Sequence, residues 1–139
     1  MTAAATEIRS VVVERELPFP PERIWRALTQ PHLMAEWLMK NDFQPVVGHK
    51  FELTGDWGSV ECQVQTLEPM KTLAYSWGAM GLESVVTWTL TPTSAGAHLR
   101  MEQKGFRPDQ EQAYRGAAFG WQKFFGNLEQ LLAAEENQG

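Results

Sequence analysis

Hydrophobic and polar positions alternate along much of the chain, and this pattern predicts its strands. Residues 8–17 are rich in valine and alternate in polarity, as in a strand with one covered and one wet face. Five further stretches between residues 51 and 101 share this period of two, separated by glycine- and proline-containing turns. Their apolar members are Phe51 and Leu53; Val60, Cys62 and Val64; Leu73, Tyr75 and Trp77; Val86, Trp88 and Leu90; Leu99 and Met101. Successive hairpins of this kind predict an antiparallel sheet.

Two short helices are predicted between the first strand and the second. Pro21 suits the first position of a helix, because its missing N–H would have no intrahelical partner there. That helix ends before Pro31, which opens another. The second helix carries its apolar residues on one side: Leu33, Met34, Trp37 and Leu38. The pair forms a V-shaped element.

Spacings of three and four residues predict one long helix near the C-terminus. Asp109 is the expected N-cap, with Gln112 completing a capping-box pattern. The apolar stripe consists of Tyr114, Ala118, Trp121, Phe125, Leu128 and Leu132. Gly116, Gly120 and Gly126 interrupt this helix, although each costs about 1 kcal/mol relative to alanine. Either a closely packed neighbour or a helix that moves would explain them.

This order of elements predicts a single α+β domain over residues 8–136, with short tails at 1–7 and 137–139. The apolar face of the sheet and the stripe of the long helix have only each other to bury against. We therefore expect a curved antiparallel sheet of about six to seven strands that grips the long helix. Such a sheet leaves space at its open end, near the helical V, where ligand pockets tend to form.

Charge and composition exclude several functional classes. The net charge is −5 and the pI about 5.2, with no basic run, so nucleic-acid binding is not expected. No apolar stretch reaches 18 residues, and residues 1–10 do not resemble a signal peptide, so we expect a cytoplasmic protein without membrane association. One cysteine excludes an internal disulfide framework. No His-x-His or cysteine pair occurs, so neither a metal nor another cofactor is expected.

Several segments carry a family resemblance when they are read together. They are Val12–Leu17, Pro21–Thr29 followed by Pro31 and Trp37, Pro69–Trp77, Ser84–Pro92, Gly96–Met101, and Gly120-Trp121 with Leu128, Leu131 and Leu132. Over almost the whole chain this order resembles the START-like (SRPBCC, Bet v 1-like) superfamily. The most similar branch is named for the C-terminal domain of the activator of heat-shock protein 90 ATPase. The resemblance implies a helix-grip fold with an internal cavity, but it transfers no catalytic residue.

Six tryptophans and seven phenylalanines in 139 residues favour a cavity lined by rings. We expect one enclosed pocket bounded by Trp37, Tyr75, Trp88 and Trp121. The full set of expected lining residues is Arg15, Met34, Trp37, Leu38, Phe51, Cys62, Tyr75, Trp77, Trp88, Met101, Gln103, Tyr114, Ala118, Trp121 and Phe125.

Three polar members of that set allow more than one interpretation. Cys62 is either a small buried hydrophobic group or a nucleophile, which would need a neighbouring base. Arg15 either pairs with a carboxylate near the sheet edge or meets an anionic or carbonyl ligand. Tyr75 either makes a single hydrogen bond within the core or helps to polarise a carbonyl group of a bound substrate. The histidines fall on other elements, and nothing in the sequence brings them to Cys62.

Three functions remain open from the sequence. The first is a binder of a small, mostly hydrophobic molecule, without a recognisable catalytic constellation and with an unassigned physiological role. The second is a cyclase- or hydrolase-like enzyme that polarises a carbonyl of a polyketide-like substrate through Arg15, Tyr75 or Cys62. The third is an interaction module related to chaperone ATPase activators. Phe119 lies off the apolar stripe and is expected to be exposed, so a monomer and a homodimer both remain open.

Overall fold

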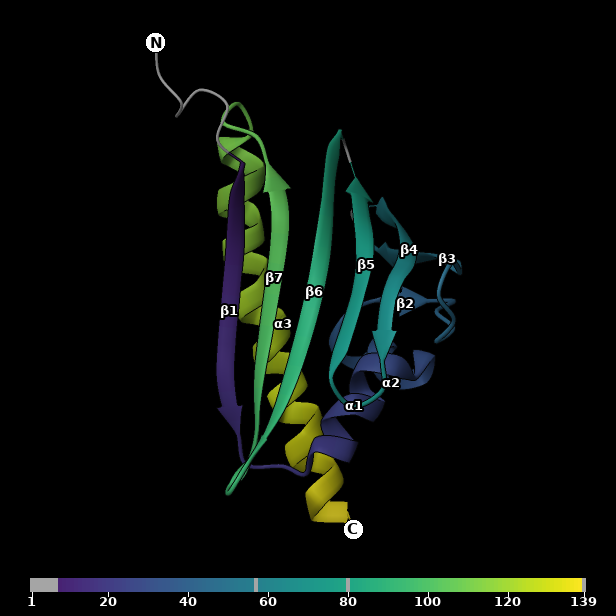
Figure 1. The fold of residues 1–139 in the computed structure, drawn as a ribbon, viewed down its shortest axis with the longest axis vertical. Coiled ribbons are helices and arrows are strands. Elements are labelled where there is room, and N and C mark those ends of the chain that lie inside the picture. Colours follow the sequence, from purple (N-terminus) through teal and green to yellow (C-terminus); the bar gives the residue numbers. More distant parts are fainter. Residues whose placement is uncertain (1–7, 57, 80, 139) are drawn as a thin grey trace.

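A computed structural model describes residues 8–56, 58–79 and 81–138 of the chain (Figure 1). Its elements are β1 (Arg9–Leu17), α1 (Pro21–Thr29), α2 (Pro31–Trp37), β2 (Lys40–Asn41), β3 (Lys50–Gly55), β4 (Gly58–Glu68), β5 (Thr72–Ala79), β6 (Leu82–Thr93), β7 (Gly96–Phe106) and α3 (Glu111–Gln138). The expected tail at 1–7 and the turn residues Trp57 and Met80 lie outside the described residues. Residues 137 and 138, expected in a tail, continue α3.

The strands of the described chain form one seven-stranded sheet in the order β1-β7-β6-β5-β4-β3-β2. Every neighbouring pair is antiparallel, so the predicted α+β helix-grip class is confirmed. Consecutive hairpins build β3 to β7. The last strand, β7, pairs with the first, β1, along the whole length of β1. The alternation pattern did not predict β2, because two residues are too few to show a period of two.

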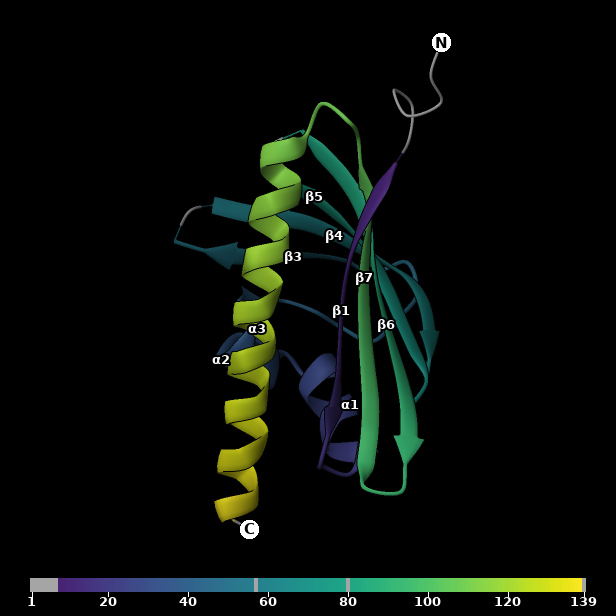
Figure 2. The ribbon, with the colours of Figure 1, turned by 90° about the vertical axis from the view of Figure 1, so that its left-hand side faces the viewer.

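The sheet curves around α3. Figure 2 shows β1 and β7 running nearly parallel to α3, whereas β3 and β4 lie almost crosswise to it. The short helices α1 and α2 pack at the end of the molecule where α3 finishes (Figure 1). Pro21 and Pro31 occupy the first turns of these helices, as their missing N–H groups predict.

Tryptophan rings form the centre of the core. The Trp88 ring lies 5.6 Å from Trp37, 5.6 Å from Trp121 and 5.7 Å from Phe125, measured between centroids. The Trp37 indole N–H donates to the Ala27 carbonyl at 2.7 Å, which fixes α2 against α1. The sheet, the helical V and α3 therefore meet around Trp88.

Gly96, at the hairpin between β6 and β7, lies close to the backbone at the end of β1. At Gly96 the backbone has φ +156°, and a Cβ would lie 2.2 Å from the Leu17 carbonyl oxygen. No side chain can be accommodated so close to backbone atoms. The absence of a Cβ here lets β7 begin directly beside the end of β1.

The long helix starts later than the sequence predicts. The Gln110 carbonyl accepts the first helical hydrogen bond, from the Tyr114 N–H at 3.0 Å, so Gln110 is the N-cap residue. The Asp109 carboxylate instead accepts from the Arg107 side chain at 3.3 Å. The prediction that Asp109 caps the helix is therefore wrong, because a neighbouring cation provides the carboxylate with another partner.

Candidate functional site

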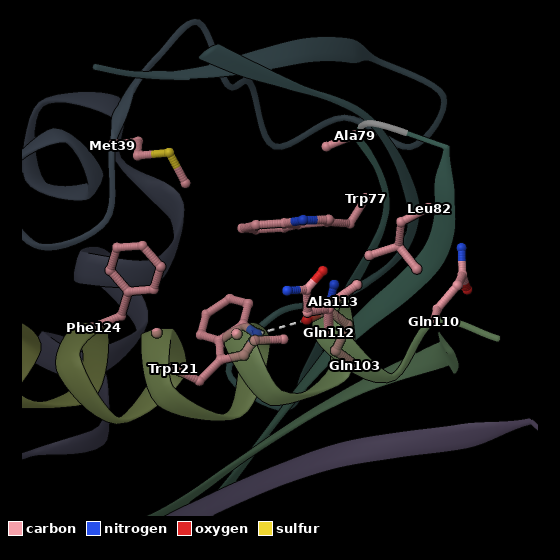
Figure 3. Close-up of a pocket in the computed structure, with 13 residues that line it drawn as sticks. Met39, Trp77, Ala79, Leu82, Gln103, Gln110, Gln112, Ala113, Trp121 and Phe124 are labelled. Atoms are coloured by element: carbon pink, nitrogen blue, oxygen red, sulfur yellow. Dashed lines mark hydrogen bonds between the residues drawn. The ribbon is translucent and has the colours of Figure 1, made fainter. Parts of the chain in front are cut away.

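A pocket of about 600 Å³ lies between the first half of α3 and the ends of β5 and β6 (Figure 3). Its lining residues are Met39, Trp77, Ala79, Leu82, Gln103, Gln110, Gln112, Ala113, Gly116, Ala117, Gly120, Trp121 and Phe124. Gln112, Ala113 and Gly116 are exposed, so the pocket opens to solvent beside the start of α3. Only Met39, just beyond α2, comes from the region of the helical V, where the opening had been expected.

The sequence of α3 creates this space by placing small residues along one flank. Ala113, Gly116, Ala117 and Gly120 all line the pocket. Apart from the adjoining residues and nearby backbone of α3 itself, no atom of the described residues lies within 4 Å of a Cβ built on Gly116 or Gly120. Close packing of a neighbour therefore does not account for these two glycines. They keep free volume beside the helix.

Ring and ion-pair contacts join the first half of α3 to β1 and β7. Tyr114 is half-buried, and its ring packs edge-on against Phe106 with centroids 5.6 Å apart. The Arg9 guanidinium lies 4.1 Å from the centroid of the Tyr114 ring and also pairs with Glu111. These contacts lie on the β1 and β7 side of the helix. The pocket occupies the opposite flank, toward β5 and β6.

A chain of buried hydrogen bonds joins the pocket wall to the sheet. The Trp121 indole N–H donates to the Gln103 side-chain oxygen at 2.7 Å. The Gln103 amide N–H donates to the Ser84 hydroxyl at 3.0 Å, and that hydroxyl donates to the Trp77 carbonyl at 2.9 Å. Gln103 is only 1% exposed, yet it lines the pocket. The network therefore fixes a polar group at the base of an otherwise mostly apolar wall.

Aromatic rings form two sides of the pocket. The Trp77 and Trp121 rings lie 5.2 Å apart and are tilted by 52°, and Phe124 packs 5.4 Å from Trp121. Figure 3 shows Trp77 edge-on, with Met39 beyond one face and Trp121 and Gln103 beyond the other. None of the lining residues has an ionisable side chain. The site suits an uncharged ligand with ring or aliphatic surface.

Three of the residues expected to line a cavity do so: Trp77, Gln103 and Trp121. The others are in the core or on its margin: Met34, Trp37, Leu38, Phe51, Cys62, Tyr75, Trp88, Met101, Tyr114, Ala118 and Phe125. The rings of Trp37, Trp88 and Trp121 contact one another in series, and Tyr75 is hydrogen-bonded to Trp88. The space lies to one side of this cluster and is not enclosed by it.

Arg15 lies beside α3 and makes several contacts there. Its guanidinium pairs with the Glu129 carboxylate at 3.0 Å and donates to the Gln122 side chain. It also lies 5.5 Å from the centroid of the Phe125 ring. This is the carboxylate pairing that the sequence left as one of two alternatives, and Arg15 does not line the pocket.

Cys62 and Tyr75 are poorly suited to reactions near neutral pH. Burial, with a smaller effect of the Asp42 carboxylate, raises the pKa of the Cys62 thiol to about 12. Burial also raises the pKa of the Tyr75 hydroxyl, and this hydroxyl accepts a hydrogen bond from Trp88 at 3.0 Å. Each side chain therefore stays protonated and serves the core.

Sequence reasoning missed ten lining residues: Met39, Ala79, Leu82, Gln110, Gln112, Ala113, Gly116, Ala117, Gly120 and Phe124. The glycine anomaly pointed to two of them. For the other eight no signal existed, because alanine, leucine, methionine and phenylalanine occur equally in cores, and glutamine is common on surfaces. Within the described part of the chain, no cluster of three or more histidine, cysteine or acidic residues could hold a metal ion.

A second hollow, of about 360 Å³, lies on the opposite face of the sheet. The charged side chains of Glu61, Glu83 and Lys104 line it, and Trp77 contributes to both hollows. The sheet is thus bordered by space on both sides near the end of β5. The outer hollow is polar, so only the inner one offers an extended apolar wall.

The curved sheet, the gripped helix and the position of the pocket define a START-like protein. More narrowly, the chain belongs to the family described as Activator of Hsp90 ATPase homolog 1-like protein, whose model matches residues 18–133. No curated protein matches the chain. None of the described helices has both the length and the apolar character needed to cross a membrane.

Solved structures show the same fold. A crystal structure of protein MLL2253 from Mesorhizobium loti is 59% identical, with a TM-score of 0.89 over 91% of this chain and 98% of that one. DynU16, a protein of the dynemicin biosynthetic locus, is 25% identical with a TM-score of 0.81, over 89% of this chain and 47% of that one. CalU16 from Micromonospora echinospora is 24% identical with a TM-score of 0.80, over 96% and 82%; it shows the fold alone.

Proposed function

We propose that the protein binds a small, mostly hydrophobic molecule in the pocket beside the first half of α3. The observation that carries this proposal is the combination of free volume with a ring-lined wall and one buried polar group. A volume of about 600 Å³ is typical of sites for small molecules. Trp77, Trp121 and Phe124 offer apolar surface, and the Gln103 amide offers a directional contact.

The relatives add support of a different kind. DynU16 belongs to a biosynthetic locus, so a protein with this fold occurs where a small organic molecule is made. That context is compatible with binding an intermediate or product. It does not identify the ligand of this chain, which the proposal leaves at the level of chemical class.

No observation favours a reaction at this site. The enzyme alternative required at least two polar groups that converge inside the pocket. Arg15, Tyr75 and Cys62 do not line it. Arg15 pairs with Glu129, the Tyr75 hydroxyl accepts from Trp88, and the Cys62 thiol donates weakly to the Val60 carbonyl at 4.0 Å. The chaperone-related alternative concerns surfaces, and no contact described here bears on it. Both alternatives stay predictions.

The decisive experiment combines native mass spectrometry of freshly purified protein with uptake of Nile red, an uncharged apolar dye. We expect a retained small molecule, or dye binding at one site per chain. Ala117→Trp places a large ring in the pocket and should reduce either signal about 10-fold or more. Ala133→Trp is the matched control, because Ala133 is exposed on the same helix and does not line the pocket.

Two results would contradict the proposal. One is the absence of both a retained molecule and dye uptake in the wild-type protein. The other is equal reduction by Ala117→Trp and Ala133→Trp, which would place the dye elsewhere or indicate a general disturbance of α3. Circular dichroism of both variants shows whether the helix content is preserved.

A further inference from the structure

The side-chain amide of Gln103 is held in one orientation. An indole N–H can only donate, so the atom that accepts from Trp121 at 2.7 Å must be the amide oxygen. The amide nitrogen then faces Ser84 at 3.0 Å. The Ser84 hydroxyl hydrogen is directed to the Trp77 carbonyl, so its oxygen is available as an acceptor. Each bond fixes the direction of the next.

This arrangement leaves one donor without a partner. A primary amide has two N–H groups, and only one of them is used by Ser84. Among the described residues, no acceptor contacts the second N–H of Gln103. Gln103 has an exposed fraction of only 1%, and it lines the pocket. A buried donor without an acceptor is costly, so a ligand that supplies the acceptor gains affinity.

The remaining lining residues limit the charge of that ligand. No lysine, arginine or histidine is present to compensate an anion, and no aspartate or glutamate is present to compensate a cation. Burying an unpaired charge there would be strongly unfavourable. The acceptor is therefore a neutral oxygen or nitrogen, such as a carbonyl, carried by a molecule with ring surface that contacts Trp77.

We propose that Gln103 is the specificity-determining residue of the pocket, and that its second N–H donates to a neutral acceptor atom of the ligand. This inference rests on the proposed function, because it concerns the same pocket. It predicts discrimination between molecules of equal shape that differ only in one acceptor. Trp121 and Ser84 are positioning residues, since they act by holding the amide.

The test uses 9-fluorenone and fluorene, two flat uncharged molecules that differ by a carbonyl at one carbon. Titration of the tryptophan fluorescence should show fluorenone binding about 2- to 10-fold more tightly, the range for one net hydrogen bond. The infrared carbonyl stretch of bound fluorenone should lie at lower frequency than in hexane. This second measurement needs no variant.

Gln103→Met removes the donor and retains similar bulk. It should abolish the preference for fluorenone, with little change in fluorene affinity, and return the carbonyl stretch to its position in hexane. Loss of the acceptor for Trp121 also lowers stability, which is why the ratio of the two affinities is measured. Gln130→Met, at an exposed position of α3 that does not line the pocket, is the matched control and should retain the preference. If Gln103→Met fails to fold, the wild-type affinity ratio and infrared spectrum still decide.

Equal affinities in the wild-type protein, or a carbonyl stretch at the hexane position, would overturn this inference and leave the pocket proposal intact. A preference that persists in Gln103→Met would do the same. If neither fluorenone nor fluorene binds although Nile red does, this inference is overturned and the pocket proposal stands; if Nile red uptake and a retained molecule are absent as well, the proposed function fails too.

Discussion

The two halves of α3 meet the sheet in different ways. Within residues 121–132, four side chains are almost completely buried: Trp121, Phe125, Leu128 and Leu132. Within residues 111–120 none is, and Tyr114 makes the main ring contact, at Phe106. One continuous helix is therefore anchored in the core over its second half and borders a pocket over its first.

This difference separates two tasks along one element. The second half contributes burial of apolar surface, the dominant favourable term in folding. The first half contributes small residues that line the pocket and leave its space unfilled. Changes in residues 125–132 should therefore alter mainly stability, and changes on the pocket flank of 111–120 mainly binding; Trp121 and Phe124, which line the pocket from the anchored half, should affect both.

The largest expected effect comes from the anchored half. Phe125 is fully buried and packs 5.7 Å from Trp88, so Phe125→Ala should lower the free energy of unfolding by about 3–5 kcal/mol. Phe119→Ala, at a side chain that is 77% exposed, should change it by about 0.5 kcal/mol or less. Urea denaturation of the two variants measures the contrast. Similar losses for both would mean that α3 is not divided in this way.

The sequence allowed the anchored half to be predicted because it depends on periodicity. Positions Val60, Cys62 and Val64 are buried as the alternation requires, and so are Trp88 and Phe125. Period two in the strands and spacings of three and four in the helix are local properties. They determine which face of each element is apolar, and hence the helix-grip arrangement.

The position of the pocket could not be predicted in the same way. Trp77 and Trp88 share the inward phase of neighbouring strands, yet Trp77 borders the pocket and Trp88 lies at the centre of the core. What distinguishes them is the set of side chains around each ring: Trp88 packs against Trp37, Trp121 and Phe125, whereas Trp77 borders a space that small residues of α3 also line. Which side chains meet depends on contacts between elements far apart in the sequence, such as Tyr114 with Phe106.

A smaller effect should separate the glycines of α3. Among the described residues, Gly116, Gly120 and Gly126 all have open space where a Cβ would stand, but only the first two line the pocket. Each glycine-to-alanine change should raise stability by up to about 1 kcal/mol, because alanine is the better helix former. Thermal or urea denaturation measures this gain.

Binding should respond at only two of the three positions. A methyl group at Gly116 or Gly120 would narrow the pocket by about the volume of that group. Both variants should therefore bind Nile red or fluorenone several-fold more weakly. Gly126→Ala serves as the matched control and should bind as the wild type does. If all three weaken binding equally, helix motion rather than local space would explain the glycines.

The smallest effect concerns the start of α3 and depends on pH. Hydrogen bonds from Arg9, and then from Arg115, lower the pKa of Glu111 below its ordinary value of 4.5. Because the pKa of Glu111 is lower in the folded state than in the unfolded state, its ion pairs stabilise the folded state fully at pH values above the unfolded-state pKa. This stabilisation is lost as the pH falls through the lowered, folded-state pKa. Glu111 is exposed, so the contribution is small and screened by salt.

Hydrogen exchange should detect this effect as a local one. As the pH falls from 6 to 3, protection factors in residues 111–120, corrected for intrinsic exchange, should decrease before those in 121–132, whose anchors are apolar. Glu111→Gln should show reduced protection in the first half already at pH 6 and little further change. The cation–π contact of Arg9 with Tyr114 does not involve Glu111, so some protection remains. Simultaneous loss along the whole helix would contradict the division, because it would show that both halves open as one unit.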